Sequence, residues 1–153
     1  MKGRRRSLAA AVALPLLAAA AEAPPEDPRA LVGQPVLALA SHPAVTLTLR
    51  QATGGRQAAV ARQARNPGPG LRITPDGGFL YGWGCGARTG CGADGLFLAL
   101  DLGRPQVFAV LFENGMPLSW VPPRASPWPA PLEGPLREFS AEVAKRMNFA
   151  APR

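Results

Sequence analysis

Every second residue from position 96 to position 102 is a leucine, and this alternation constrains the fold more than any other feature of the chain. It is the pattern of a β-strand that turns one apolar face toward a core. A Gly-Arg-Pro turn at residues 103–105 leads into residues 106–112, a run that is apolar on both faces. We therefore predict two neighbouring strands, the second of them inside a sheet.

Turn signals on both sides of this pair extend the sheet. The Asn-Gly pair at residues 114–115 is a strong hairpin signal and predicts a returning strand over residues 116–121. Upstream, the turn residues 75–78 join two shorter apolar runs, residues 71–74 and 79–83. The sequence therefore predicts an antiparallel meander of about five strands.

Helices are expected at both ends of this meander but not as the main architecture, because the chain contains 17 glycines and 18 prolines. Helix-forming residues at 56–65 favour a helical segment over residues 36–65, interrupted near Gly54 and Gly55. A second helix is expected to begin near Pro135, where apolar residues recur at helical spacing. These residues are Leu136, Phe139, Val143 and Met147.

The connection over residues 122–131 contains five prolines, and we expect it to cross the surface in an extended form. Trp128 lies within it and is the tryptophan that we expect to be most exposed. The other tryptophans and the phenylalanines are expected to supply core area.

The first 21 residues match the three regions of a secretory signal peptide: a basic start, an apolar run and small residues before a cleavage site. The apolar run is shorter than the 20 or so residues that span a membrane. We expect cleavage after Ala21, a mobile leader over residues 22–35 and one domain over residues 36–150, in a periplasmic or secreted protein without a stable membrane span. Cleavage would lower the net charge from +7 to +3, so the composition does not favour nucleic-acid binding.

Cys85 and Cys91 are the only cysteines, and an oxidising compartment favours a disulfide between them. Closing this short ring stabilises the fold by roughly 2 kcal/mol on chain entropy alone. Two interpretations stay open: the bridge is only a structural staple, or it rigidly presents a partner-binding loop. The loop residues are Gly86, Ala87, Arg88, Thr89 and Gly90. The predicted fold class is thus α+β, an antiparallel meander with flanking N-terminal and C-terminal helices and one short disulfide loop.

The remaining candidate sites argue against an enzyme. Two cysteines and the single histidine, His42, are too few ligands for zinc and give no catalytic triad, so His42 is expected to cap a helix or lie on the surface. The acidic residues lie at turns or strand ends and show no pairing typical of acid–base catalysis. Two glycine patterns resemble nucleotide-binding loops, but a strand follows them where a helix is required, so we interpret these glycines as turn residues beside the disulfide. They are Gly82, Gly84, Gly90, Gly92 and Gly95. No catalytic residue, cofactor or metal site is predicted.

Between residues 71 and 121 the chain resembles the Ivy family, periplasmic inhibitors of vertebrate lysozyme. The resemblance rests on the Tyr-Gly-Trp-Gly-Cys segment at residues 81–85, on Cys91-Gly92 and the leucine strand after it, and on Glu-Asn-Gly at residues 113–115. It also rests on element order: an export signal, a helical first part, a strand entering a disulfide loop, a meander and a helix. The resemblance implies that the loop between the cysteines enters the lysozyme cleft, where the family presents a histidine to the catalytic carboxylates.

The loop itself departs from the family. Members typically carry a Cys-Lys-Pro-His-Asp-Cys-like loop, whereas five residues without a histidine separate the cysteines here, so only Cys85 and Cys91 carry over. Arg88 at the loop apex is suited to approach acidic groups through charge-assisted hydrogen bonds. The first hypothesis is a protein-binding module whose implied partner is lysozyme or another peptidoglycan-cleaving enzyme. The alternative is a small exported structural or envelope-associated domain with a purely stabilising disulfide.

Overall fold

The computed structural model describes residue 23 and residues 25–151. In this part of the chain, a 3₁₀ helix and three short α-helices precede a sheet, and a 3₁₀ helix and two short α-helices follow it. The first group is η1 (Pro28–Leu31), α1 (Val36–Ala40), α2 (Pro43–Ala52) and α3 (Gln57–Ala64). The second group is η2 (Ala130–Leu132), α4 (Glu133–Phe139) and α5 (Ala141–Ala144).

Five antiparallel strands form one sheet, and each strand pairs with the next strand along the chain. They are β1 (Arg72–Ile73), β2 (Phe79–Gly86), β3 (Gly90–Asp101), β4 (Val107–Glu113) and β5 (Met116–Val121). The predicted meander is therefore confirmed. Strand β4 lies between β3 and β5, and its apolar residues 107–112 are all buried, as their pattern on both faces indicated.

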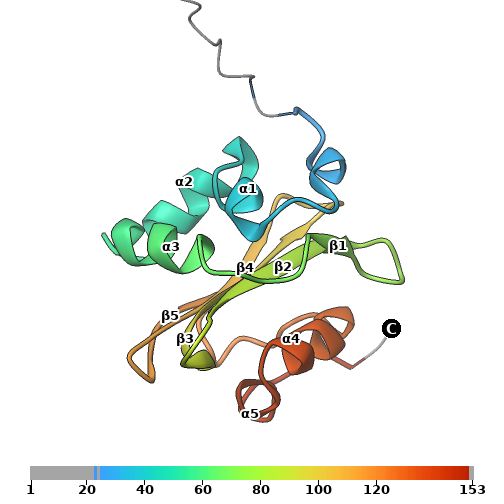
Figure 1. Ribbon diagram of the computed structural model, residues 1–153. Coiled ribbons are helices and arrows are strands. Elements are labelled where there is room, and N and C mark those ends of the chain that lie inside the picture. Colours follow the sequence, from blue (N-terminus) through green and yellow to red (C-terminus); the bar gives the residue numbers. More distant parts are fainter. Residues whose placement is uncertain (1–22, 24, 152–153) are drawn as a thin grey trace, which may run out of the picture.

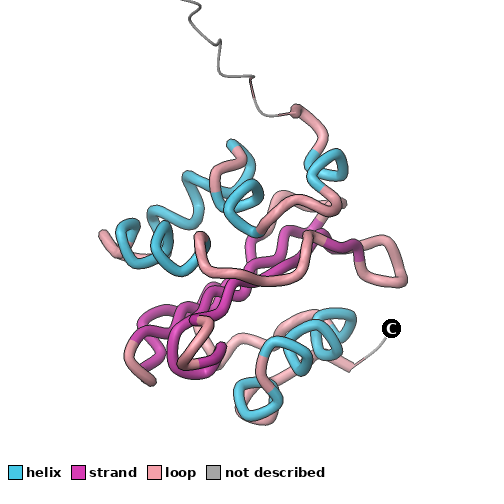
Figure 2. The backbone as a smooth tube through the Cα atoms, viewed as in Figure 1, coloured by secondary structure: helices cyan, strands magenta, loops and turns pink. Residues whose placement is uncertain are grey.

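The helices cover the two faces of the sheet separately (Figures 1 and 2). Helices α1, α2 and α3 lie on one face, and α4 and α5 lie on the other. Since neighbouring residues of a strand point to opposite faces, each inner strand contributes alternately to two separate cores. The predicted α+β class with flanking helices is confirmed.

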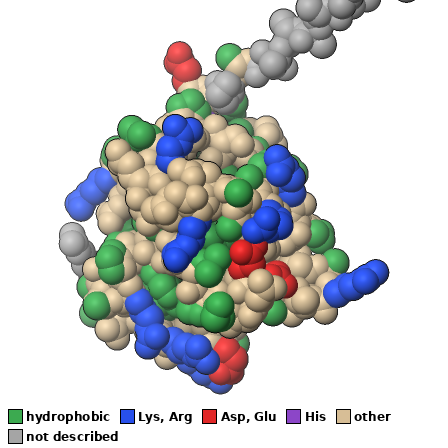
Figure 3. All heavy atoms as spheres, turned by 90° about the vertical axis from the view of Figure 1, so that its left-hand side faces the viewer, with side chains coloured by type: hydrophobic (Ala, Val, Ile, Leu, Met, Phe, Trp, Pro, Cys, Tyr) green, Lys and Arg blue, Asp and Glu red, His purple; other side chains and the backbone are tan. Residues whose placement is uncertain are grey.

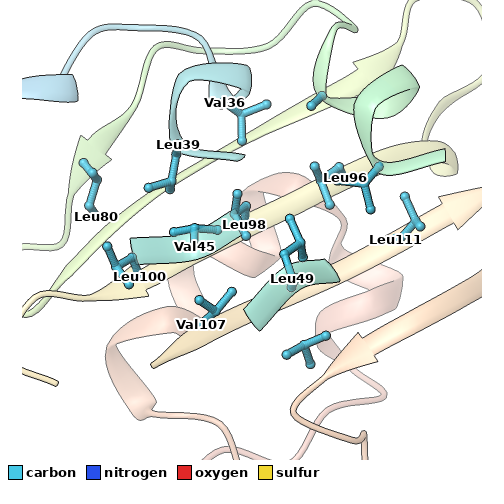
Figure 4. Packing of buried hydrophobic residues seen from close by; sticks show 14 of the residues in the cluster. Val36, Leu39, Val45, Leu49, Leu80, Leu96, Leu98, Leu100, Val107 and Leu111 are labelled. Carbon is cyan, nitrogen blue, oxygen red and sulfur yellow. The ribbon is translucent and has the colours of Figure 1, made fainter. Parts of the chain in front are cut away.

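The core under the N-terminal helices consists of aliphatic side chains, and we call it the aliphatic cluster (Figure 4). The leucine face predicted for β3 lies there, with Leu96, Leu98 and Leu100 almost completely buried. Val45 and Leu49 of α2 pack against it from the helical layer. The alternation of leucine thus marks the face that receives the N-terminal helices.

The core under the C-terminal helices contains most of the aromatic side chains, and we call it the aromatic cluster. Its aromatic members are Phe79, Tyr81, Trp83, Phe97, Phe108, Phe112, Trp128 and Phe139. The apolar stripe predicted after Pro135 is buried in it, from Leu136 to Met147. The stripe lies on two helices, since Ser140 ends α4 and its hydroxyl accepts a hydrogen bond from the Val143 amide, 3.3 Å away, which caps α5.

The N-terminal helical segment is confirmed, and it is divided at two points. The expected interruption at Gly54 and Gly55 separates α2 from α3, and both glycines have positive φ angles. A second break at Ser41 separates α1 from α2, and His42 begins α2 as its N-cap. The histidine Nδ1 accepts a hydrogen bond from the Ala44 amide at 3.2 Å, so His42 is a capping residue, although it is also buried.

Trp128 contradicts our expectation, because it is fully buried rather than exposed. Its ring packs against Phe108 and Phe97, with ring centroids 5.4 and 6.1 Å away. Its backbone amide and carbonyl hydrogen-bond to residues 148 and 150, which joins this part of the proline-rich connection to the C-terminal segment. The connection is also less extended than expected, because it turns at residues 123–126 and enters η2 at Ala130. Proline content does not reveal that the connection runs along a covered face.

Gly84 differs from the expectation, because it lies inside β2 and not in a turn. Gly82 also lies inside β2, which agrees with the strand expected over residues 79–83 and not with its interpretation as a turn residue. A Cβ atom at Gly84 would lie 2.7 Å from the backbone oxygen of Gln63, and one at Gly82 would lie 2.8 Å from Leu71 Cδ2. The segment that leaves α3 therefore runs directly over these two glycines. Gly92 and Gly95 likewise lie inside β3. Gly90 is the first residue of β3, and its φ of 78° is the positive backbone angle by which the turn enters the strand.

The N-terminal part of the described chain packs on the helical layer. Residues 28–31 form η1, and Leu31 is buried in the aliphatic cluster. Backbone hydrogen bonds of 2.8 and 2.7 Å join Gly33 and Gln34 to Leu71, so the end of the segment expected to be a mobile leader lies against the domain. The expected signal peptide, residues 1–21, lies outside the described residues. Among the described helices, none combines the length and the apolar character needed to cross a membrane.

Candidate functional site

The connection between β2 and β3 is a tight turn closed by a disulfide. Cys85 and Cys91 form the predicted bridge, with Cα atoms 4.5 Å apart. Gly86 pairs with Gly90, and residues 87–89 form the turn between them; we call these three residues the disulfide turn. The turn therefore has little freedom to change its shape.

The sheet and the aromatic cluster fix the base of this turn. Both cysteines pack at the edge of the aromatic cluster. Cys85 is paired with Gly95, where a Cβ atom would lie 2.8 Å from the Cys91 carbonyl oxygen and 3.1 Å from the Phe139 ring. The close approach requires a glycine at position 95 and brings the two cysteine backbones together.

The disulfide turn is open to solvent. Ala87, Arg88, Thr89 and Gly90 are exposed, and Gly86 is half-buried. Arg88 is the middle residue of the turn, so its guanidinium is presented at the end of the hairpin. A cationic, five-donor group on a short closed loop is suited to bind carboxylates.

Asp94 joins the disulfide turn to the neighbouring turn between β4 and β5. Its carboxylate accepts a hydrogen bond from the Asn114 amide at 2.9 Å, and Thr89 lines the same hollow beside it. The Asn114 bond first, and then the Thr89 hydroxyl, lower the pKa of Asp94 below the usual value of an aspartate. A backbone hydrogen bond of 2.9 Å from Gly115 to the Ala93 carbonyl adds a second link. The β4–β5 turn is thus held directly against the base of the disulfide turn.

A polar hollow lies between these two turns and the end of α3, with a volume of about 490 Å³. Arg62 of α3 donates two hydrogen bonds to one carboxylate oxygen of Glu113, the bond from Nε being 2.8 Å long. Asn66 donates to the side-chain oxygen of Gln63 at 2.6 Å. The other lining residues are Gly86, Thr89, Asp94 and Asn114. Figure 3 looks onto this side of the molecule, where acidic, basic and apolar side chains lie close together.

Sequence reasoning identified the disulfide turn but missed this surrounding surface. Arg62 and Glu113 are 51 positions apart, and Asn114 is 20 positions from Asp94. No local pattern signals such contacts. The Asn-Gly hairpin signal did locate the β4–β5 turn, but it did not indicate that the turn contacts the cysteine loop.

The other polar residues serve local structure. Asp76 accepts hydrogen bonds from the Thr74 hydroxyl and the Gly78 amide, which lower its pKa and close the β1–β2 turn. Asp101 accepts from the amides of residues 103 and 104 in the β3–β4 turn. Within the described chain no cluster of three or more histidine, cysteine or acidic side chains is placed to hold a metal ion.

Comparison with known proteins identifies the family. The family model described as Inhibitor of vertebrate lysozyme (Ivy) matches residues 44–142, which is more than half of the chain. The chain belongs to the Ivy family. No curated protein and no solved structure matches it.

The match indicates the class of function that is typical of the family. It spans the sequence from α2 to α5 and therefore includes the disulfide turn, the β4–β5 turn and the polar hollow. Ivy is a family of lysozyme inhibitors and not of enzymes. Binding to another protein, rather than catalysis, is the activity that the family indicates.

Proposed function

We propose that this Ivy protein is an exported inhibitor of a lysozyme-type muramidase, and that its disulfide turn enters the enzyme's cleft. The main observation behind this proposal is that Arg88 is exposed at the centre of a turn closed by Cys85 and Cys91. A turn that is already fixed before binding loses little conformational entropy in the complex. Rigidity and exposure together are what a cleft-inserting loop needs.

Arg88 supplies the charge that such a cleft attracts. Glycosidases of this kind hydrolyse their substrate with a pair of carboxyl groups, so the cleft is acidic where the reaction takes place. A guanidinium binds carboxylates through paired, charge-assisted hydrogen bonds. In this protein Arg88 therefore takes the place that the family's loop histidine would occupy. Once Arg88 binds the two catalytic carboxylates, they are not available to hydrolyse the substrate.

The test is a titration of a vertebrate lysozyme with the mature protein, following hydrolysis of bacterial cell walls. The wild-type protein should inhibit at micromolar concentration or below. Arg88→Ala should weaken inhibition about 30-fold or more, as expected for an arginine at the centre of an interface. Arg104→Ala is the matched control, because Arg104 is also exposed but lies in the β3–β4 turn at the opposite end of the sheet.

The outcomes separate the proposal from its alternative. Full lysozyme activity in the presence of excess wild-type protein, tested also on a bacterial lytic enzyme, would leave a structural envelope domain as the better interpretation. Equal inhibition by wild type and Arg88→Ala would show that the turn is not the inhibitory element. Export is a separate part of the proposal, and it predicts that protein recovered from the periplasm begins at Glu22.

A further inference from the structure

Two turns lie side by side at the same end of the sheet, below α3 in Figure 1. The disulfide turn connects β2 with β3, and the β4–β5 turn connects the next two strands. The amides of Asn114 and Gly115 bond to Asp94 and Ala93, respectively, each at 2.9 Å. The second turn is therefore continuous with the site that presents Arg88.

We infer that the partner-binding surface is formed by both turns, residues 87–89 and residues 114–116, and that Asp94 is the positioning residue that fixes one turn relative to the other. This inference rests on the proposed inhibition of a muramidase. It adds a second contact, made by Met116, to the contact that Arg88 makes. We call these residues together the two-turn surface.

Met116 supplies the apolar part of this surface. Its side chain is 61% exposed at the start of β5, and the residue pairs with Glu113 across the turn. A methionine is flexible and polarisable, so it adapts to an irregular apolar surface. The two-turn surface thus presents a cation and an apolar group at a fixed spacing. The partner that fits it is an enzyme with an acidic cleft and an apolar side chain on the cleft's edge.

Asp94 controls the spacing because it belongs to β3, just after the disulfide turn, and hydrogen-bonds to the neighbouring turn. Its carboxylate accepts from the Asn114 amide and the Ala93 carbonyl accepts from Gly115, each at 2.9 Å, so the two turns cannot separate without losing these bonds. Thr89 and Asp94 lie together at the wall of the polar hollow. Holding both contacts in place before binding reduces the entropy that the complex must lose.

The first experiment compares the inhibition constants of Met116→Ser and Leu47→Ser against a vertebrate lysozyme. Leu47 is a matched control because its side chain is also 61% exposed, but it lies on α2, away from the two turns. Met116→Ser should weaken inhibition roughly ten-fold, since burial of the thioether chain is lost. Leu47→Ser should leave the inhibition constant unchanged.

The second experiment tests the positioning residue with two variants of Asp94. Asp94→Ala removes the acceptor of the Asn114 hydrogen bond and should weaken inhibition roughly five-fold. Asp94→Asn keeps a side-chain oxygen that accepts from the Asn114 amide, so it should restore most of the inhibition. If Asp94 acted only through its charge, both variants would weaken inhibition equally, because both remove the same charge.

The outcomes distinguish this inference from the proposed function. If Arg88→Ala abolishes inhibition but Met116→Ser has the same inhibition constant as Leu47→Ser, the disulfide turn binds the enzyme alone. The inference that both turns form the partner-binding surface is then wrong. If Asp94→Asn is as weak as Asp94→Ala, the positioning by hydrogen bonds is wrong. If the wild-type protein does not inhibit, the proposed function and the inference both fall.

Discussion

Strand β2 allows the two faces of the sheet to be compared within one stretch of chain. Toward the aromatic cluster it turns Phe79, Tyr81 and Trp83, and toward the N-terminal helices it turns Leu80, Gly82 and Gly84. On the aromatic side, large rings fill the space between the strand and α4. On the other side, the backbone between α3 and β1 lies directly on the strand, and the Cys85 amide bonds to the Pro67 carbonyl at 2.9 Å.

The two faces of β2 should therefore be destabilised by different kinds of substitution. The aromatic face is sensitive to the removal of atoms, because nothing replaces a missing ring. The glycine side is sensitive to added atoms, because a methyl group has no space. The disulfide lies at the edge of the aromatic face, and the polar hollow lies beside the end of α3, so the candidate site lies where both kinds of packing end.

Removal of the Trp128 ring is expected to have the largest effect on the aromatic face. Trp128→Ala should lower the free energy of unfolding by about 4 kcal/mol, because a fully buried indole leaves a large cavity. Trp120→Ala is the matched control, since Trp120 is only half-buried on the edge strand β5. In urea unfolding, Trp120→Ala should lose less than half as much unfolding free energy as Trp128→Ala. Similar losses in both variants would mean that the aromatic cluster does not depend on Trp128.

Addition of one methyl group should damage the opposite face. In Gly84→Ala the new Cβ would lie 2.7 and 2.8 Å from two backbone oxygens, which cannot move as a side chain can. We expect a loss of about 3 kcal/mol in unfolding free energy. Gly92→Ala on β3 is the control, because its new Cβ would meet no atom closer than 3.8 Å. A Gly84→Ala protein as stable as Gly92→Ala would disprove the close backbone contact.

The difference between the faces also explains which parts of the fold the sequence could predict. The leucine alternation of β3 and the Asn-Gly turn are local signals, so they identified the meander. The same signals do not tell which face receives which helices. Gly84 was assigned to a turn because the role of a glycine inside a strand becomes clear only when the chain that crosses it is known. Trp128 was placed on the surface for the same reason, since the covered face is not visible in its proline-rich surroundings.

For the candidate site, the sequence predicted what lies close together along the chain. Cys85, Cys91 and the exposed Arg88 belong to one short loop, so their arrangement followed from their spacing and from the expectation of an oxidising compartment. Asp94 and Asn114 come together only through the register of β3 against β4, in which Gly95 pairs with Phe112. The two turns themselves follow bulges in the neighbouring β2–β3 and β4–β5 ladders, and no residue pattern marks either bulge.

Opening the disulfide should have a smaller effect on stability than either core substitution. Replacing both Cys85 and Cys91 by serine removes the ring constraint, which is worth roughly 2 kcal/mol of unfolding free energy. Because the bridge lies at the edge of the aromatic cluster, the near-ultraviolet circular dichroism of the folded variant should remain close to that of the wild type. Loss of that signal at full far-ultraviolet intensity would show that the bridge organises the aromatic face, not only the turn.

Two arginine–glutamate pairs provide the finest comparison of the faces. On the aromatic side, Arg72 bonds to Glu138 at 2.7 Å and its guanidinium lies 5.2 Å from the ring centroids of both Tyr81 and Trp83. On the aliphatic side, Arg62 pairs with Glu113. Arg72→Ala should therefore lower the free energy of unfolding by about 1 kcal/mol, because ion pair and cation–π contacts are lost together. Arg62→Ala should change it by at most about 0.5 kcal/mol.

Salt concentration separates the two contributions at Arg72. Screening at 1 M salt shortens the reach of exposed charges to about 3 Å, so the ion pairs of Arg72 and Arg62 should both weaken. Contact of the Arg72 side chain with the two rings does not depend on the ion pair, and most of the loss in Arg72→Ala should persist in urea unfolding at high salt. If the loss of unfolding free energy in Arg72→Ala disappears at high salt, Arg72 acts only as a surface charge. Its contact with the rings of Tyr81 and Trp83 then contributes nothing to stability.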